Sequence, residues 1–486
     1  MLAQPLQPQD VGKNFNGQLS TASDDRVFAD GSYQTPNKPV YADVMGQFLQ
    51  LFTYNHGVAL FELNETIPRD TVVKEFEQAA AKILEAIPWL GHRVVRQGVR
   101  DGFSGRFKSA EWPGESPQRS FIKFKDCTEL CPSYEELIAA QAPAKMLDGG
   151  LLCPVPGFPT PYDIAKHGDP PVFLVQVSFI RGGALVNFSN QHNVMDGTGL
   201  FRVITLLASV MCGEQIPAEV VEQANRDPAS VVPLYGPNDV IRDHSWLKAT
   251  ARPLPTMSSP RTARWTQLRF SRKIAQQVKA IASDPVGYDP AVPFVSSEDA
   301  VISLYWKCLA GFRIKDGVDP MRSSRMLRAL DSRGVLGVSQ SYMGQLVYYS
   351  RTFLTLEELT TLPLSSIACS MRRNLINDNT EFSVRSYATW LSRVPDKSTL
   401  IYCGPADRTT DISCSSMANA SLVFRYGSLG EPKCIRRPNL PPVPGTLYFY
   451  PPDASGDMNL LVCLNDEEME ELNNNELWAA ATQVIG

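Results

Sequence analysis

His192, Asp196 and Gly197 stand at H-x-x-x-D-G spacing. An imidazole has an ordinary pKa of about 6.5, so much of it is neutral at pH 7 and can take a proton from an alcohol or an amine. The spacing therefore predicts a general base at His192. Asp196 also has a purely structural interpretation, because an aspartate before a helix is a good N-cap and Asp-Gly is a common turn pair.

The surrounding sequence predicts a strand, a loop and a helix. Two apolar, β-branched-rich runs at 171–180 and 184–189 flank Arg181-Gly182-Gly183, which favours a hairpin because glycine supplies the positive φ of tight turns. Apolar residues then recur at helical spacing over about 199–212. We therefore expect His192 just past a strand end and Asp196 before the first helical turn. The other histidines, which we interpret as structural, are His56, His92, His167 and His244.

Composition excludes several classes of function. The chain has 486 residues, 43% of them hydrophobic, which allows a large core and favours two domains over one. A net charge of -5 offers no general attraction for nucleic acid. The motifs of a serine hydrolase elbow, a P-loop and a dinucleotide site do not occur. Ten scattered cysteines, with no signal peptide and no apolar run of membrane-spanning length, predict reduced thiols in a cytoplasmic protein without a metal site or a membrane partner.

Proline and polar residues crowd positions 225–263, where no sustained periodicity is found. This composition predicts a long crossover linker between an N-terminal domain, 1–224, which carries the H-x-x-x-D-G motif, and a C-terminal domain, 264–486. Both halves have α/β patterning. The second is predicted to open with a strand over 265–270 and a helix over 273–282, followed by a helix from Ser296 with Asp299 in the capping-box position.

The order of these features resembles the BAHD acyltransferase family, in particular its fungal branch typified by trichothecene 3-O-acetyltransferase. The similar stretches are Ile87-Pro88-Trp89-Leu90-Gly91, Ser297-Glu298-Asp299-Ala300 with Trp306, Asp331-Ser332-Arg333 and Tyr342-Met343-Gly344-Gln345. One loop departs from the family. Its D-F-G-W-G signature aligns with 425–430, where an aromatic residue and two glycines remain but Arg425 replaces the aspartate.

The resemblance implies a fold of two chloramphenicol-acetyltransferase-like domains, each a mixed β-sheet with flanking helices, which meet around a channel. It also implies an O-acyltransferase that moves an acetyl or longer acyl group from acyl-CoA to a hydroxyl, or an amine, of a small secondary metabolite. The resemblance further implies that no acyl-enzyme forms and that acyl-CoA is a co-substrate, with no permanently bound cofactor. The family expectation for oligomeric state is a monomer.

Specific roles follow from the same resemblance. His192 takes the proton, and Asp196 pairs with Arg333 to hold the catalytic loop. Gly197 is expected to allow a tight turn and a close backbone approach beside the base. A donor to the oxyanion is expected at Ser415 or Ser416. The loop on the acyl-CoA side contains Tyr426, Gly427 and Gly430.

Two basic clusters could meet the phosphates of CoA, although such clusters are also common on solvated faces. One contains Arg261, Arg264, Arg272 and Lys273, and the other contains Lys433, Arg436 and Arg437.

Two alternatives to this function remain. The acyl group could come from a carrier-protein thioester, as in condensation domains, although Gln191 stands where those carry a second histidine. The changed loop at Arg425 could instead mark a non-catalytic ligand-binding relative.

Overall fold

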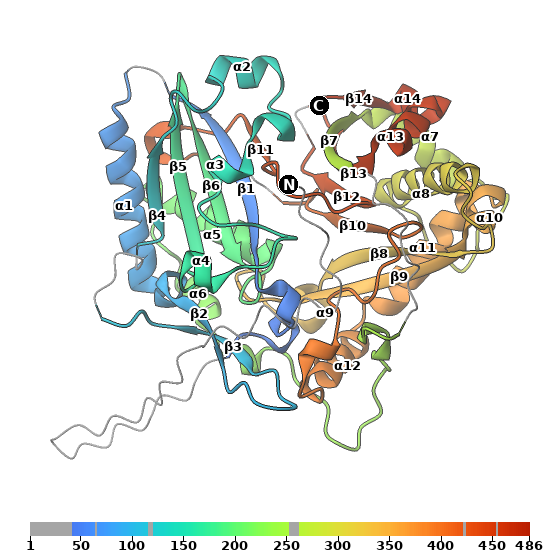
Figure 1. Ribbon diagram of the computed structural model, residues 1–486, viewed down its shortest axis with the longest axis horizontal. Helices are drawn as coiled ribbons and strands as arrows, with labels where there is room; N and C mark the ends of the chain where they lie inside the picture. The colour runs from blue at the N-terminus through green and yellow to red at the C-terminus, as the bar shows by residue number, and fades with distance from the viewer. Residues whose placement is uncertain (1–40, 64–65, 115–119, 252–261, 421–423, 453–454) are drawn as a thin grey trace.

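The computed structural model describes residues 41–486 apart from 64–65, 115–119, 252–261, 421–423 and 453–454 (Figure 1). Two β-sheets dominate it, and a two-stranded ribbon, β2-β3, lies beside the first. The first sheet has the order β11-β1-β6-β5-β4, and its strands are β1 (Tyr54–Glu62), β4 (Ile122–Asp126), β5 (Phe173–Ile180), β6 (Gly183–Gln191) and β11 (Cys434–Arg436). The ribbon strands are β2 (Arg93–Gln97) and β3 (Arg106–Ala110).

Helices α1 (Arg69–Ala86) and α5 (Gly197–Met211) cover one face of the first sheet and pack against each other (Figure 1). Each turns an apolar stripe inward, since helical periodicity brings residues three and four apart onto one side. In α1 the stripe is Val72, Phe76, Ala79, Ala80 and Ile83. Every residue of β5 and β6 is buried, so the hairpin that precedes His192 is a rigid support.

The second sheet has the order β14-β7-β13-β12-β10-β8-β9. Its strands are β7 (Ala263–Phe270), β8 (Ser323–Asp331), β9 (Val347–Thr355), β10 (Ile412–Ser416), β12 (Thr446–Tyr450), β13 (Met458–Asn465) and β14 (Thr482–Val484). Helices α7 (Arg272–Ala282), α8 (Ser297–Lys315), α10 (Leu356–Thr361), α11 (Leu364–Asp378), α13 (Asp466–Asn474) and α14 (Glu476–Ala481) lie on one side of it (Figure 1). Trp306, at the centre of α8, is fully buried and donates its indole hydrogen to Ser324 Oγ at 2.8 Å.

Shorter helices complete the connections. They are α2 (Tyr134–Ala139), α3 (Gly149–Leu152), α4 (Ile164–His167), α6 (Ala218–Ala224), α9 (Arg333–Leu336) and α12 (Glu381–Ser392), with 3₁₀ turns that include Val44–Gly46 and Leu49–Leu51. None of the helices in the described part of the chain combines the length and apolar character that a bilayer crossing needs.

The local sequence predictions agree closely with these elements. The hairpin strands, the helix after His192, the strand at 263–270 and the helix at 272–282 each lie within two residues of the predicted bounds. Helix α8 begins at Ser297 after a capping box in which Ser296 and Asp299 bond to each other's backbone. Strand β6 extends to Gln191, so His192 is the first residue beyond it.

The expected division is 1–224, 225–263 and 264–486. It does not include a segment of the second half that packs into the first. Strand β11 from the second half pairs antiparallel with β1, and Tyr426 and Leu429 lie in the core of the first sheet. Residues 225–251 of the crossover have no strand and two 3₁₀ turns, Pro228–Ser230 and Ser245–Leu247, and the last residue of the crossover, Ala263, already belongs to β7. Three of the prolines used to predict it, Pro253, Pro255 and Pro260, lie outside the described residues.

Candidate active site

His192 is held by the backbone on both sides of the loop. Its amide donates to Thr53 O at 2.8 Å, and its ring Nδ1 lies 3.4 Å from Met195 O. Asn190 Nδ2 donates to the same Met195 carbonyl at 2.6 Å and fixes its direction. With a hydrogen on Nδ1 facing this carbonyl, the lone pair is on Nε2, which is the form a general base needs.

The environment of the ring keeps it neutral. Burial lowers the pKa of His192 from its ordinary 6.5, and the charge of Asp196 only partly opposes that effect. The half-buried imidazole is therefore a free base at neutral pH.

We expect the rate to persist into mildly acidic solution. Burial penalises the imidazolium, so the proton is lost at a lower pH than from a free histidine, and the acid limb of kcat/KM should have its midpoint below pH 6.5. A profile of kcat/KM from pH 5 to 9 would measure it. A midpoint above that value would show that the limiting group is not this buried ring.

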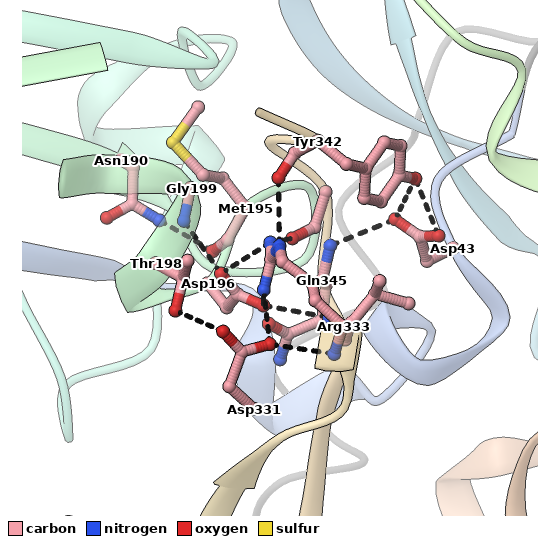
Figure 2. Close-up of polar contacts among 12 residues, drawn as sticks. Asp43, Asn190, Met195, Asp196, Thr198, Gly199, Asp331, Arg333, Tyr342 and Gln345 are labelled. Carbon is pink, nitrogen blue, oxygen red and sulfur yellow. Dashed lines mark hydrogen bonds and ion pairs between the residues drawn. The ribbon is translucent and has the colours of Figure 1, made fainter. Parts of the chain in front are cut away.

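Asp196 is fully occupied by hydrogen bonds (Figure 2). Its Oδ1 accepts the Gly199 amide at 2.8 Å and Arg333 Nη2 at 3.0 Å, and its Oδ2 accepts Arg333 Nη1 at 2.9 Å and the Leu346 amide at 2.8 Å. The bond to Gly199 makes Asp196 the N-cap of α5. Both interpretations of this residue from the sequence, cap and arginine partner, thus apply to one carboxylate.

Arg333, at the start of α9, is fully buried, and all of its N–H groups are used. Besides Asp196, Nε donates to Tyr342 O at 2.9 Å, Nη2 to Gly344 O at 2.8 Å and Nη1 to Asp331 at 2.9 Å. Burial alone would lower the pKa of Arg333, but the charges of Asp196 and Asp331 raise it above its ordinary value. The pair joins the loop after β6 in the first half to the turn between β8 and β9 in the second.

Sequence analysis missed a second carboxylate in this network (Figure 2). Asp43 is buried, accepts the Tyr342 hydroxyl at 2.7 and 2.8 Å, and accepts the Gln345 amide at 2.9 Å. Burial raises its pKa to about 7, against the hydrogen bonds from Tyr342 and Gln345. The segment that follows is tied to the catalytic loop, because Asn193 Nδ2 donates to the carbonyls of Gly46 and Phe48.

Substituting Asp43 by asparagine should change how stability depends on pH. The folded-state pKa of about 7 exceeds the ordinary 3.8, so the folded protein binds the proton more tightly, and stability is lost as pH rises between these values. Asparagine stays neutral, so the melting temperature of Asp43→Asn should improve relative to the parent between pH 4 and pH 8. Melting curves across that range would test it, and a constant difference would contradict the assignment.

The close backbone approach expected at Gly197 is found at Gly199 instead. A Cβ at Gly197 would meet only Phe201, at 4.0 Å, so no close approach requires a glycine there. The steric demand is at Gly199, where a Cβ would lie 2.2 Å from Met343 O. Close packing of α5 against the 342–346 turn explains this, and no local sequence signal could have revealed it.

The two serine candidates face opposite sides of β10. Ser416 Oγ donates to Glu298 on α8 at 2.7 Å, on the same side of the strand as the buried Cys414. Side chains alternate along a strand, so Ser415 faces the other side, beside its register partner Tyr448. That side contacts Ala144 of the first half through the cluster around Trp265. Ser415 is therefore the candidate that lies between the two halves.

The loop aligned with D-F-G-W-G is held by a buried tyrosine and by hydrogen bonds to α1. Tyr426 is fully buried against Phe61, with ring centroids 5.1 Å apart, while Gly427 and Gly430 have positive φ. Ser428 donates its amide and hydroxyl to Glu75 of α1 at 3.0 and 2.7 Å. Arg425 is exposed, so the charge reversal is placed at the surface and Glu75 supplies a carboxylate for the loop.

The three basic candidates have different partners. Arg264 pairs with Asp466 at 2.8 Å, and Lys433 lies 3.9 Å from Glu62, both as exposed ion pairs of small strength. Arg436 donates to the carbonyl of Gln141 at 3.4 Å, and Arg269, on the same strand as Arg264, donates to the Gln141 side chain at 2.8 Å. Arg261 lies outside the described residues. Within the described residues, no group of three or more His, Cys, Asp or Glu side chains could hold a metal ion.

Family models match most of this chain. Residues 53–212 match the trichothecene 3-O-acetyltransferase-like N-terminal domain, and residues 158–477 match the Transferase family. The chain belongs to the Transferase family, the BAHD acyltransferases. The family inferred from the sequence is thereby confirmed.

Curated relatives of this Transferase family member are fungal enzymes. It is 38% identical to O-acyltransferase pigD of Monascus ruber over 448 residues, covering 91% of this chain and 98% of the relative. It is 38% identical to O-acetyltransferase epaC of Aspergillus niger over 449 residues, covering 92% and 97%. The chain is thus an acyltransferase, as the sequence predicted.

Solved structures agree on the fold. A crystal structure of F. graminearum TRI101 complexed with coenzyme A and T-2 mycotoxin superposes with a TM-score of 0.82 at 27% identity, covering 92% of this chain and 100% of the other. Vinorine synthase matches with a TM-score of 0.61 at 12% identity over 93% and 97%, which shows a shared fold alone. The predicted mixed α/β fold of this family is confirmed.

Proposed function

We propose that this Transferase family member moves an acyl group from acyl-CoA to a hydroxyl group of a secondary metabolite, with His192 as general base and without an acyl-enzyme. The observation that carries the proposal is the position of the His192 ring, whose Nδ1 lies 3.4 Å from Met195 O and leaves Nε2 to take a proton, on a loop clamped to both halves of the molecule. Relatives named O-acetyltransferase and a TRI101 structure complexed with coenzyme A support the choice of donor and reaction.

The chemistry needs no covalent step on the enzyme. His192 Nε2 takes the hydroxyl proton as the acceptor oxygen attacks the thioester carbonyl, and the C–O bond forms. The tetrahedral intermediate then expels the CoA thiolate, which receives the proton from the imidazolium. The products are an ester and free CoA. Ser415 is our candidate donor to the oxyanion, and orientation of the two substrates supplies much of the remaining acceleration.

Asp196 takes no part in the proton transfer in this proposal. All of its acceptor positions are filled by Arg333 and two backbone amides, so it has no lone pair for the imidazole or for a substrate. Its role is to position the loop. Exposed ion pairs at Arg264 and Lys433 can exchange their carboxylate partners for phosphates of CoA, and Arg436 is a third candidate cation.

The test is a product assay. Purified protein is incubated with acetyl-, malonyl- and longer acyl-CoAs and a fungal metabolite extract, and His192→Ala is run in parallel. A product heavier by one acyl group, absent with the variant, is the expected result. The same assay is repeated with acyl groups carried as thioesters on a carrier protein. Products formed only in that second assay would show that the donor is the carrier protein and not CoA. CoA binding without any product from either donor would favour a non-catalytic relative.

A further inference from the structure

A pocket of about 260 Å³ opens at one end of the second sheet, away from the residues considered so far. It is lined by Trp246, Ala251, Arg325, Arg351, Phe353 and Pro405. Two arginines and two large aromatic rings line one small pocket. This lining suits a planar group that carries negative charge.

Strand register places Arg325, Arg351 and Phe353 on the face of the sheet opposite its helices. Arg325 of β8 pairs with Phe353 of β9, and Leu327 pairs with Arg351, so both arginines lie on one side. The intervening Met326 faces the core under α8.

His192 lies near the same face of the sheet. Tyr349 is two residues before Arg351 and therefore shares its side of β9. Its ring meets Tyr402 edge-on at 5.5 Å, and Tyr402 meets His192 edge-on at 6.0 Å. Two tyrosine rings thus separate the pocket strand from the imidazole.

The two arginines differ in how their charge is balanced. Arg325 pairs with Asp411 at 3.4 Å and donates to Cys403 O at 3.0 Å, so its charge is balanced and its side chain is held in place. Arg351 lies with its guanidinium carbon 3.9 Å from the centre of the Trp246 ring. In the described part of the chain, no carboxylate lies within ion-pair distance of Arg351. The pocket therefore holds a net positive charge on a flat aromatic wall.

The position favours the acceptor over the donor. Strand β9 is one edge of the sheet, and β7, which carries Arg264, is next to the other edge. Arg436 lies toward β7, because it and Arg269 of β7 both donate to Gln141. The residues that suit CoA phosphates and this pocket thus lie toward different edges of the second sheet. A volume of about 260 Å³ accommodates one substituted ring rather than a whole metabolite.

We propose that this pocket anchors an acidic, planar end of the acceptor, with Arg351 binding its carboxylate or other oxyanion while Trp246 and Phe353 cover the ring. The substrate class is then an acidic aromatic or conjugated alcohol. The proposal rests on the acyl transfer proposed above, and it names the acceptor for that same site.

Binding can be tested without turnover. The probes are 4-(hydroxymethyl)benzoate and its primary amide, titrated calorimetrically into the parent, Arg351→Met, Arg351→Lys and His192→Ala. The parent should bind the acid about tenfold more tightly than the amide, as expected for one charge-assisted contact. Arg351→Met should abolish this preference, Arg351→Lys should keep part of it, and His192→Ala should keep all of it.

The matched control is Arg100→Met, which removes another arginine stacked on an aromatic ring, Phe103, at an exposed site. It should leave the preference unchanged. Equal binding of acid and amide by the parent, or none of either, would overturn the proposal. Coenzyme A is titrated in the same way. A loss of coenzyme A affinity in Arg351→Met would also overturn the proposal, because the pocket would then hold the nucleotide. These titrations measure binding and not turnover, so they test the pocket even if the protein shows no acyl transfer.

Discussion

Replacing His192 with alanine is expected to lower kcat by about 10²–10⁴-fold, the usual contribution of general base catalysis. The reason is geometric as well as chemical. The ring is neutral, its Nδ1 faces the Met195 carbonyl, and its Nε2 is the nitrogen left to take a proton. Steady-state rates with acetyl-CoA and an acceptor found in the product assay would give the ratio.

The matched control for this variant is His167→Ala, which removes an exposed histidine at the end of α4. It should keep the parent rate. His192→Ala should keep the parent melting temperature, because the half-buried ring makes a single long hydrogen bond, and it should still bind coenzyme A. Turnover within tenfold of the parent would place the base elsewhere.

The elements around the base were predictable from local sequence because short-range physics determines them. The Gly182-Gly183 turn, the apolar face of α5 and the capping box at Ser296 and Asp299 all depend on residues within a few positions of one another. The pair of Asp196 with Arg333 is different, since 137 residues separate the partners. Only the resemblance to a family could suggest it.

Features that depend on tertiary contact were missed or misassigned. Asp43 precedes a 3₁₀ turn with no periodic pattern, and its partners Tyr342 and Gln345 lie some 300 residues away. The glycine required by packing proved to be Gly199 rather than Gly197, because the neighbour is a carbonyl from the second half. To choose between Ser415 and Ser416, one must know which face of β10 points toward the first half of the molecule, and sequence alone does not reveal this.

These missed contacts converge on one region. The turn at 342–346 receives Asp43 from the start of the described chain, Asp196 from the catalytic loop and the close approach of Gly199. Arg333 binds both sides of it through backbone carbonyls. The catalytic loop is therefore positioned by the second half of the molecule, although every residue of the loop belongs to the first.

Asp196→Asn should expose this dependence. The amide keeps the shape of the side chain but leaves Arg333 buried without its bidentate partner, which should lower the free energy of unfolding by about 3–5 kcal/mol. Activity should fall with stability, because the loop that carries His192 loses its tie to Leu346 and Arg333. Urea unfolding alongside kinetics would measure both, and unchanged unfolding with lost turnover would mean that Asp196 acts on the chemistry directly.

The control uses the other carboxylate on the same guanidinium. Asp331 also lies 2.9 Å from Arg333 Nη1, but 35% of its side chain is exposed, so water screens the pair. Asp331→Asn should therefore cost less than about 1 kcal/mol. A double-mutant cycle of Asp196→Asn with Arg333→Met should then show that the second substitution adds little to the first, because each alone breaks the same clamp. Additive losses would mean that the two residues stabilise the protein separately, and that the two halves are held around His192 by other contacts.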